Sequence, residues 1–499
     1  MPIDPRSPVV VGVGQTSQRV PAEAAKPPIE LLEDAARVAE ADAGASLLAQ
    51  TDIVAVVMIV SWPYPDPGAL LARRLGITPR TTAVSTVGGN SPQLLVDEFA
   101  ERIQRGDCDV VLIGGAESMY TRWRARREPR YELTWDSGGD EPCPWVIGDG
   151  RPGSSDYELA HGAAAPTLVY PLFETALRAE AGRSIAQHQQ AVGELWSRFA
   201  GIAAENPNAW SRTAFTAEEI HTVTADNRMV AFPYPKRMCA NIDVDQGAAV
   251  ILCAYETARA AGIADAHMVF LHAAAESHDH YFVSERDTLT RSPGIAAATA
   301  DALGAAGIGA DDVARFDIYS CFPSAVQVAA RELGIAASDA RPLTVTGGLG
   351  FAGGPVNNYP THGIAQMVHA LRADPGSYGL TTALGWYITK HAVGVWSTGP
   401  PAAGFRRVDP AKTQARVDAQ PARAIAGLVD GTATIEATSV AFDRDDTAAN
   451  ATVTLLTDDG RRALARTSDV ALATALTTAE WEGRRVRLTN DGSANSIAE

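Results

Sequence analysis

A chain of 499 residues is too long for one ordinary hydrophobic core, so two or three domains are expected. Its formal net charge of −17 argues against non-specific nucleic-acid binding, which needs a basic surface. Five cysteines without CxxC spacing fit a reducing cytoplasm and give no zinc signal, and neither a secretion signal nor a run of ~18 apolar residues indicates export or a membrane span.

The first elements alternate between strands and helices. Residues 9–13 predict a buried strand, 31–43 an alanine-rich helix and 52–60 a second strand. Strands that alternate with helices of this length indicate a parallel sheet with helices on its faces.

Residues 81–119 predict a strand, a turn, a helix and a further buried strand. The first strand ends at Gly88-Gly89, and the corner Asn90-Ser91-Pro92 predicts that a helix begins there, with Ser91 more typical of a helix cap than of a nucleophile. The free N–H groups of such a helix end can hold an oxyanion. We therefore expect Gly89, Asn90 and Ser91 to contact a substrate.

Two parts of the chain share one plan. Residues 52–89 and 317–348 each read as a strand, a Ser-containing corner before proline, a helix ending in LARRLGI or AARELGI, a short strand and a Gly-Gly pair. The offset is 259 residues both from Ser61 to Ser320 and from Gly88 to Gly347. Two copies of one α/β half-domain are the simplest explanation.

The helix, Gly106, Asp109, the apolar strand and GGAESM, in this order, resemble the nucleophile segment of thiolases. This resemblance implies a thiolase fold: two similar βαβαβαββ halves with a loop domain between them. Counting back without a gap, the nucleophilic cysteine of the family falls on Gly89, which has no side chain. A site of this kind cannot form an acyl-cysteine intermediate.

A second motif comes from thiolases of the sterol-carrier-protein type, which carry HDCF where this chain has residues 319–322, YSCF. The family histidine corresponds to Tyr319 and the family cysteine to Cys321, so both are candidates for proton transfer. The alternatives are a core aromatic at position 319 and an inert buried thiol at position 321.

The Gly-His-Pro motif of the family corresponds to Gly353-Gly354-Pro355, where the histidine is again missing. His362, just ahead of a helix expected near Gly363, is a candidate to reach the same volume, the alternative being an exposed residue or a helix cap. We expect Gly348, Gly354 and Tyr359 to line the substrate site.

The last family motif, CxG, should fall within residues 381–394, which contain no cysteine. Polar Tyr387, Lys390 and His391 interrupt this apolar stretch, and His391 is taken as a further catalytic candidate. A solvent-exposed Lys-His pair after a strand is the alternative. His278-Asp279-His280 gives only a weak metal signal, so no metal site is expected.

Residues 121–230 change in composition and resemble the thiolase loop domain, which in the family carries much of the coenzyme A site. Arg122, Arg124 and Arg126, in a run that extends to Arg130, are candidates for contacts with coenzyme A phosphates. A solvated basic face is the alternative.

After residue 400 the pattern becomes short strands, at 433–442, 451–456, 461–466 and 485–488, with Asp458-Asp459-Gly460 as a hairpin signal. They predict a small β-barrel similar to the OB-like half of proteins that accompany sterol-carrier-type thiolases. The whole chain looks like thiolase-like proteins usually labelled acetyl-CoA acetyltransferase.

These interpretations give four parts: an N-terminal half (1–120 and 231–262), a loop domain (121–230), a C-terminal half (263–400) and an OB-like β-barrel (401–499). The first functional hypothesis is a protein that acts on a β-keto or β-hydroxyacyl-CoA without a covalent intermediate, by retro-aldol cleavage or its reverse. A non-catalytic acyl-CoA carrier or assembly partner, and an ordinary acetyl-CoA acetyltransferase, are the alternatives. Acyl-CoA or coenzyme A is the expected ligand, without a further cofactor, on a homodimer or monomer.

Overall fold

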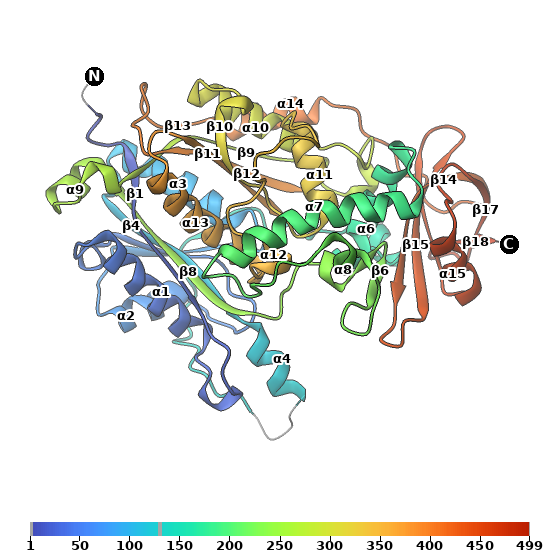
Figure 1. Cartoon of the computed structure of the whole chain (residues 1–499), viewed down its shortest axis with the longest axis horizontal. Helices are drawn as coiled ribbons and strands as arrows, with labels where there is room; N and C mark the ends of the chain where they lie inside the picture. The colour runs from blue at the N-terminus through green and yellow to red at the C-terminus, as the bar shows by residue number, and fades with distance from the viewer. Residues whose placement is uncertain (1–2, 128–131, 499) are drawn as a thin grey trace.

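The computed structural model describes residues 3–127 and 132–498. Two half-domains lie side by side, and a β-barrel stands beyond them at the C-terminal end (Figure 1). The predicted α/β class and the C-terminal barrel are confirmed. None of the described helices is long and apolar enough to cross a membrane.

The first half is a sheet in the order β3-β2-β4-β8-β1. Parallel pairing joins β2 to β3 and β4, whereas β8 runs antiparallel to β4 and β1. Its strands and the helices between them are β1 (Pro8–Ser17), α1 (Pro28–Ala43), β2 (Ile53–Val56), α2 (Pro67–Leu75), β3 (Thr81–Ser85), α3 (Ser91–Arg105), β4 (Val110–Ser118), β8 (Asp245–Ala254) and, after β8, α9 (Tyr255–Ala260). The strand predicted over 52–60 ends at Val56, because the Met58 and Val60 N–H groups donate to side chains, Ser85 Oγ and Glu117 Oε1, rather than to the backbone of a neighbouring strand.

The second half repeats this order as β10-β11-β12-β9, and β9 joins β1 through Val9–Phe270 and Val10–Val269. It contains β9 (Val269–His278), α10 (Pro293–Ala306), β10 (Val313–Asp317), α11 (Pro323–Glu332), α12 (Gly348–Phe351), α13 (Tyr359–Ala373), β11 (Tyr378–Gly385), β12 (Lys390–Ser397) and β13 (Arg406–Arg407). The short strand expected after α11 does not form: residues 341–347 run in bends, held by Asp317 through Thr344 and Thr346. The helix expected near residue 363 begins at Tyr359 instead.

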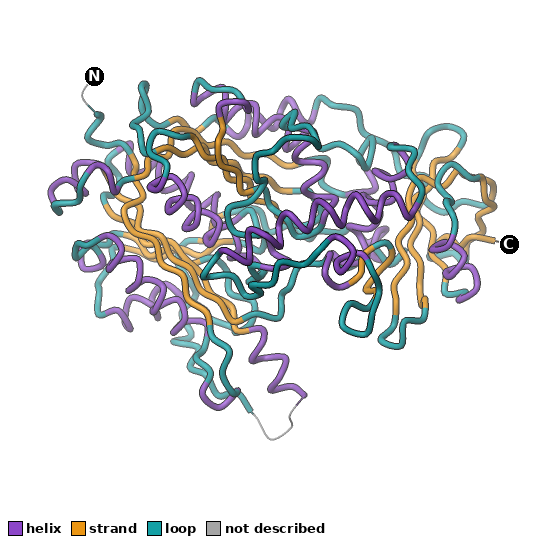
Figure 2. The backbone as a smooth tube through the Cα atoms, in the orientation of Figure 1, coloured by secondary structure: helices purple, strands orange, loops and turns teal. Residues whose placement is uncertain are grey.

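Helices α3 and α13 lie between the two halves (Figure 1). Helix α3 packs on β4 and β8 of its own half and on β11 and β12 of the other, and α13 packs on β10 and β11 and on β1 and β8. Helices α1 and α2 cover the outer face of the first half, and α10 covers the second (Figure 2). This arrangement places the N-terminal ends of α3 and α13 inside the molecule.

Between β4 and β8 the chain forms a mainly helical insertion. Its elements are α4 (Met119–Arg127), β5 (Val146–Ile147), α5 (Asp156–Ala160), α6 (Pro166–Glu180), α7 (Ile185–Glu205), α8 (Ala217–His221), β6 (Met229–Phe232) and β7 (Tyr234–Pro235). Strand β5 pairs with the outer edge of β3, and β6 pairs with β14 of the barrel. The insertion thus contacts the first sheet and the barrel.

Five strands close the barrel in the order β14-β15-β16-β18-β17, with β17 pairing back to β14. The C-terminal elements are α14 (Pro410–Asp418), β14 (Gly431–Phe442), β15 (Ala448–Thr457), β16 (Arg462–Thr467), α15 (Val470–Thr478), β17 (Arg485–Asn490) and β18 (Asn495–Ala498). Helix α14 packs on β9 and α10 rather than on the barrel. Gly460, with a φ of 80°, makes the turn between β15 and β16.

Candidate functional site

The turn before α3 contains Gly89, which the sequence resemblance matches to the thiolase nucleophile. Gly88 has a φ of 150°, and its N–H donates to Asn357 Oδ1 at 2.9 Å. Helix α3 begins at Ser91, whose hydroxyl donates to the Thr86 carbonyl at 2.8 Å, so Ser91 does not cap the helix as predicted. Asn90 is the N-cap residue without a capping side-chain bond, and its buried Oδ1 has no partner among the described residues. The helix end is therefore tied to the opposite half through Asn357.

There is no space for a side chain at Gly89. A Cβ atom built on this residue would lie 2.3 Å from the Tyr319 hydroxyl oxygen and 2.5 Å from the Leu384 carbonyl oxygen. Contacts below 3.0 Å do not occur for real Cβ atoms, so the Tyr319 ring fills the volume that a nucleophile at position 89 needs. The missing side chain and the large aromatic are two parts of one packing arrangement.

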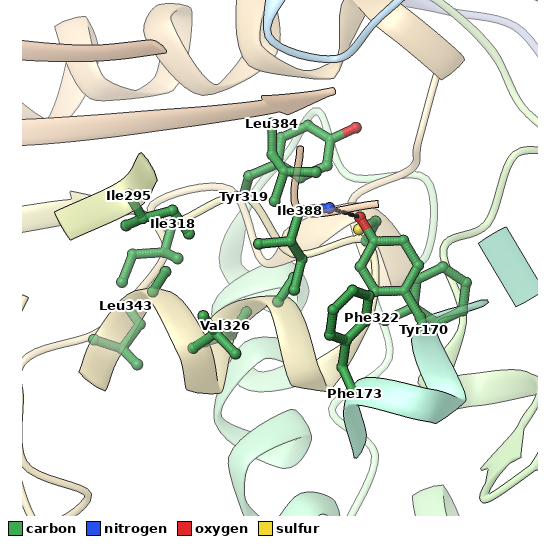
Figure 3. Packing of buried hydrophobic residues seen from close by; sticks show 14 of the residues in the cluster. Tyr170, Phe173, Ile295, Ile318, Tyr319, Phe322, Val326, Leu343, Leu384 and Ile388 are labelled. Carbon is green, nitrogen blue, oxygen red and sulfur yellow. Dashed lines mark hydrogen bonds between the residues drawn. The ribbon is translucent and has the colours of Figure 1, made fainter. Parts of the chain in front are cut away.

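Tyr319 and Cys321 follow β10 and are both buried. Burial raises the pKa of the Cys321 thiol to about 12 and holds the pKa of the Tyr319 phenol well above its usual 10. The Tyr319 ring stands perpendicular to that of Tyr359 at 5.6 Å. Figure 3 shows the Tyr319 hydroxyl pointing away from the apolar side chains of Ile318 and Val326. Near neutral pH both groups stay protonated, so neither is a ready base.

Tyr170 and Phe322 stack at 4.5 Å and pack the other end of this cluster (Figure 3). The Tyr170 hydroxyl donates to the Trp386 carbonyl at 2.8 Å and accepts from the Ile388 N–H at 3.3 Å. Trp386 and Ile388 have positive φ angles of 59° and 53°, so this bond stabilises an unusual turn. A cavity of about 10 Å³, no more than one water molecule, remains beside Tyr319.

His362 lies in the first turn of α13 and is buried, not exposed. Its Nδ1 lies 2.9 Å from Gln15 Oε1 of β1, while its Nε2 and the Gln15 amide nitrogen have no partner among the described residues. Burial lowers the pKa of the imidazole to about 3, so the side chain is neutral. In the same turn, the Tyr359 hydroxyl bonds Thr346 Oγ1 at 2.6 Å.

The two candidate glycines of the second half, Gly348 and Gly354, differ in the space around them. A Cβ at Gly348 would meet Phe199 and Ser320 at 2.7 Å, and Gly348 has a positive φ of 78°. At Gly354 the nearest atoms, the Asn241 carbonyl and Leu349, lie 3.4 Å away, which is ordinary contact. Position 354, which the sequence resemblance matches to the family histidine, therefore has room for a Cβ atom, unlike Gly89.

Lys390 and His391 point to opposite faces of β12, and both are buried rather than a solvent-exposed pair. Lys390 Nζ donates to the carbonyls of Val87 at 2.6 Å and Asp149 at 3.0 Å, beside the Gly88 turn, and burial lowers its pKa to about 8. His391 Nε2 lies 2.9 Å from Asp279 Oδ2 on the outer side of the sheet. The structure thus brings Lys390 to the turn, whereas His391 faces away from it. The sequence pattern hinted that Lys390 faces the site but singled out His391, not Lys390, as the catalytic candidate.

The α4 arginines lie apart from this turn. Arg122 donates to the Val60 carbonyl at 2.9 Å, and Arg126 stacks over Trp123 at 5.3 Å. Arg124 lies 5.2 Å over the Tyr120 ring, which meets Trp210 edge-on at 5.4 Å, and Arg19 lies 4.0 Å over Trp210. We call Arg19, Tyr120, Arg124 and Trp210 the aromatic–arginine cluster. Arg130 lies outside the described residues.

The aromatic–arginine cluster is joined to the Gly354 loop by backbone bonding. The Trp210 N–H donates to the Ala352 carbonyl at 2.9 Å, two residues before Gly354. Over the residues that the structure describes, no group of three or more His, Cys, Asp or Glu side chains converges to hold a metal ion. The polar chemistry near the Gly88 turn therefore comes from Lys390, the tyrosines and backbone amides.

Comparison with known proteins gives consistent matches. A family model described as the additional C-terminal domain of thiolase-like protein type 1 matches residues 412–493. The crystal structure of a monomeric SCP2-thiolase-like protein type 1 from Mycobacterium smegmatis shares 35% identity with the chain, covers 100% of both chains and superposes with a TM-score of 0.85. Among curated proteins, none matches the sequence significantly.

More distant structures share the core fold. The Ltp2–ChsH2(DUF35) aldolase is 19% identical over 79% of this chain and 98% of that chain, with a TM-score of 0.61. The dimeric peroxisomal thiolase of Saccharomyces cerevisiae is 14% identical over 79% of this chain and 98% of that chain, with a TM-score of 0.55. At these identities the likeness shows the fold alone.

Proposed function

Because the chain belongs to the SCP2-thiolase-like proteins of type 1, we propose that it binds an acyl-CoA thioester on its thiolase scaffold without forming an acyl-cysteine intermediate. The observation that carries this proposal is the Tyr319 hydroxyl, which occupies the volume a nucleophile at Gly89 would need. Covalent acyl transfer requires an activated nucleophile within reach of a base. Cys321, with a pKa raised to about 12, does not meet that requirement.

Binding, and not turnover, is the favoured role of the site. Three of the candidate residues have pKa values far from neutral: burial raises that of Cys321 to about 12, holds that of Tyr319 well above 10 and lowers that of His362 to about 3. A general acid or base works best with a pKa near the operating pH. We infer that the chain carries or presents an acyl-CoA to a partner.

The aromatic–arginine cluster supports the binding part of the proposal. Arg19 and Arg124 can pair with phosphate oxygens, while Trp210 and Tyr120 offer ring faces and edges for a nucleotide base. The bond from Trp210 to Ala352 joins this cluster to the Gly354 loop, where a Cβ atom at position 354 would make only ordinary contacts. A coenzyme A molecule held here would direct its thioester toward Gly354.

Retro-aldol cleavage is the second candidate, and Lys390 is the observation that favours it. An amine with a pKa lowered to about 8 beside the Gly88 turn is partly neutral at physiological pH and can accept a proton. Cleavage of a β-hydroxyacyl thioester needs a base and a stabilised enolate but no acyl acceptor on the enzyme. This candidate requires Lys390 to leave the Val87 and Asp149 carbonyls when substrate binds.

Calorimetric titration of the full chain with acetyl-CoA and longer acyl-CoAs, followed by mass spectrometry of protein and ligand, tests these alternatives. We expect binding, at least tenfold weaker affinity in Arg19→Glu/Arg124→Glu, and no covalent adduct. Arg406→Glu/Arg444→Glu is the matched control for net charge, because both are exposed arginines outside the aromatic–arginine cluster. Formation of an aldehyde or ketone that Lys390→Met abolishes would favour retro-aldol cleavage. A covalently acylated protein would refute the proposal.

A further inference from the structure

The junction between the insertion and the C-terminal barrel contains a fully buried histidine. His161 is the C-cap residue of α5 in the insertion, and it faces Asn495, an equally buried residue at the start of β18. The Asn495 N–H donates to His161 Nε2 at 2.9 Å, and His161 Nδ1 lies 2.7 Å from the Tyr157 carbonyl oxygen. Each ring nitrogen therefore has one partner, one from the insertion and one from the barrel.

These two partners fix the protonation state of the imidazole. A carbonyl oxygen only accepts hydrogen bonds, so Nδ1 carries the proton that is donated to Tyr157. A backbone N–H only donates, so Nε2 is the unprotonated nitrogen. The other neutral tautomer would lose both bonds, and a doubly protonated ring would set an imidazole N–H against the Asn495 N–H. The contact between His161 and Asn495 therefore requires a neutral histidine.

Asn495 is also the residue that attaches β18 to the rest of the barrel. Its side-chain amide donates to the Gly427 carbonyl at 2.9 Å and to the Leu464 carbonyl at 2.8 Å. Among the described residues, β18 pairs with β17 at four positions but with β16 at one, Arg466–Ser496. A displacement of Asn495 would therefore loosen the closure of the barrel between β16 and β18.

Other bonds between α5 and the barrel do not involve the imidazole nitrogens. The Leu464 N–H donates to the Tyr157 hydroxyl at 2.9 Å, and Thr452 Oγ1 donates to the His161 carbonyl at 2.9 Å. These bonds form equally well with a neutral or a charged ring. They hold α5 on the barrel while the contact between His161 and Asn495 forms or breaks.

The surroundings of His161 oppose a positive charge on its ring. Among the described residues no carboxylate lies within 4.0 Å of it, whereas His391 bonds a carboxylate at 2.9 Å. The charged groups that face it, Arg466 of β16 and Asp491 before β18, lie 3.7 Å from each other. Burial lowers the pKa of His161 below its usual 6.5; the bond to Tyr157 opposes this, and Arg466 lowers the pKa while Asp491 raises it.

We propose that the contact between His161 and Asn495 is a pH-dependent connection between the insertion and the barrel. At neutral pH the unprotonated Nε2 holds the Asn495 N–H, and β18 closes the barrel. In acid Nε2 takes up a proton, the two N–H groups repel each other, and the start of β18 moves away from α5. The open form binds this proton more readily because water solvates the charge, so a pH below 6.5 shifts the population toward the open form.

The test is hydrogen exchange of the full chain between pH 7.5 and 4.5, measured by mass spectrometry and corrected for the chemical exchange rate at each pH. We expect protection of the β18 amides to fall about tenfold between pH 7.5 and 5, while protection of β8, in the core of the first half, stays within about twofold. His161→Gln keeps an acceptor oxygen near the position of Nε2 but does not titrate, so β18 should keep its protection in acid. His221→Gln, at a partly exposed position of the insertion, is the control and should show the loss seen in the parent chain.

Arg466→Gln is a second variant, at an exposed position of β16. It removes a positive charge that opposes protonation of His161, so the pH at which β18 loses half of its protection should rise. Unchanged β18 protection in the parent chain down to pH 4.5, or an equal loss in β8 and β18, would overturn the proposal. The same holds if β18 of His161→Gln responds to acid as the parent does. If His161→Gln does not fold, Arg466→Gln decides: an unchanged or lower midpoint pH would overturn the assignment to His161.

Discussion

The Tyr319 hydroxyl oxygen lies 2.3 Å from the point where Gly89 would carry a Cβ atom, so these two residues are complementary in shape. One comes from the start of α3 in the first half, and the other follows β10 in the second half. A thiolase nucleophile at position 89 and a tyrosine at position 319 cannot occupy this volume together. Gly89, matched by sequence to the thiolase nucleophile, and Tyr319, matched to the family histidine, thus form one packing arrangement in which the tyrosine fills the space beside Gly89.

Gly89→Ala should destabilise the fold by roughly 1–3 kcal/mol, because the new methyl group forces Tyr319 or the Leu384 carbonyl to move. Gly354→Ala is the matched control, since its nearest neighbours lie at 3.4 Å, and we expect a change within about 1 kcal/mol. Urea unfolding of both variants measures the difference. Equal stabilities of the two variants would show that Tyr319 does not fill the Gly89 position in solution.

The sequence predicted the α/β class, the glycine pair at the start of a helix and the C-terminal strands, because periodicity and turn residues are local signals. It identified Tyr319 as a candidate only through the family resemblance, which matches it to the family histidine. That the Tyr319 ring enters the Gly89 volume depends on the packing of two halves more than 200 residues apart in the chain. A local sequence pattern cannot predict a contact between residues so far apart in the chain.

Other parts of the candidate site could not be derived for similar reasons. Alternation along β12 predicts that Lys390 and His391 face opposite sides, but which of them faces the Gly88 turn depends on register with β9 and β11. The pairing of β5 with β3, and of β6 with the barrel, joins two-residue and four-residue strands that are too short for a periodic signal. The hydrogen bonds that Arg462 of β16 donates to the Val283 and Ser284 carbonyls are likewise tertiary contacts.

His362 should make the fold sensitive to acid. Its pKa is lowered from 6.5 to about 3, so the folded chain keeps the imidazole neutral while the unfolded chain takes up a proton below pH 6.5. The contribution to stability is fully present above pH 6.5 and falls as the pH falls toward 3, by about 2 kcal/mol between pH 6.5 and 5. His362→Gln should lose this part of the pH dependence.

Urea midpoints at pH 7.5 and 5 for the parent chain and for His362→Gln measure this contribution. His221→Gln, at a partly exposed position bonded to Gln190, is the control and should keep the parent pH dependence. An unchanged pH dependence in His362→Gln would place the acid-sensitive group elsewhere.

We expect the chain to be a monomer because its own segment covers the edge of the first sheet. The Val84 and Thr86 N–H groups donate to the Trp145 and Ile147 carbonyls, which leaves fewer free groups on β3 for a second chain. Trp145 holds this segment by packing against Phe99 at 5.4 Å and under Arg102 at 4.3 Å. The similar structure from Mycobacterium smegmatis is likewise described as monomeric.

Trp145→Ala should loosen the covering segment, expose the β3 edge and promote self-association that rises with protein concentration. Light scattering after size-exclusion chromatography measures the mass. Trp481→Ala, which removes a similar aromatic–arginine contact on the barrel, is the control and should stay monomeric. A Trp145→Ala chain that remains a monomer at high concentration would mean that the edge is protected in another way.

The last prediction concerns the contact between the barrel and the second half. Arg462 is fully buried, forms two hydrogen bonds with Glu436 at 2.7 and 2.6 Å, and donates to carbonyls of the loop 283–287. Arg462→Met should destabilise the fold by roughly 3–5 kcal/mol, because it leaves the partly buried Glu436 carboxylate without its partner. Protection from hydrogen exchange should fall most at the backbone amides of residues 283–287.

Two further variants separate the charge from the packing. Arg462→Met/Glu436→Gln should recover part of the stability, because no unpaired charge remains. Arg485→Met removes an exposed barrel ion pair with Asp458 and should change stability by less than about 1 kcal/mol. If Arg462→Met proves no more harmful than Arg485→Met, the barrel is not held to the loop 283–287 through this arginine, and its attachment to the second half must depend on the apolar contacts around it.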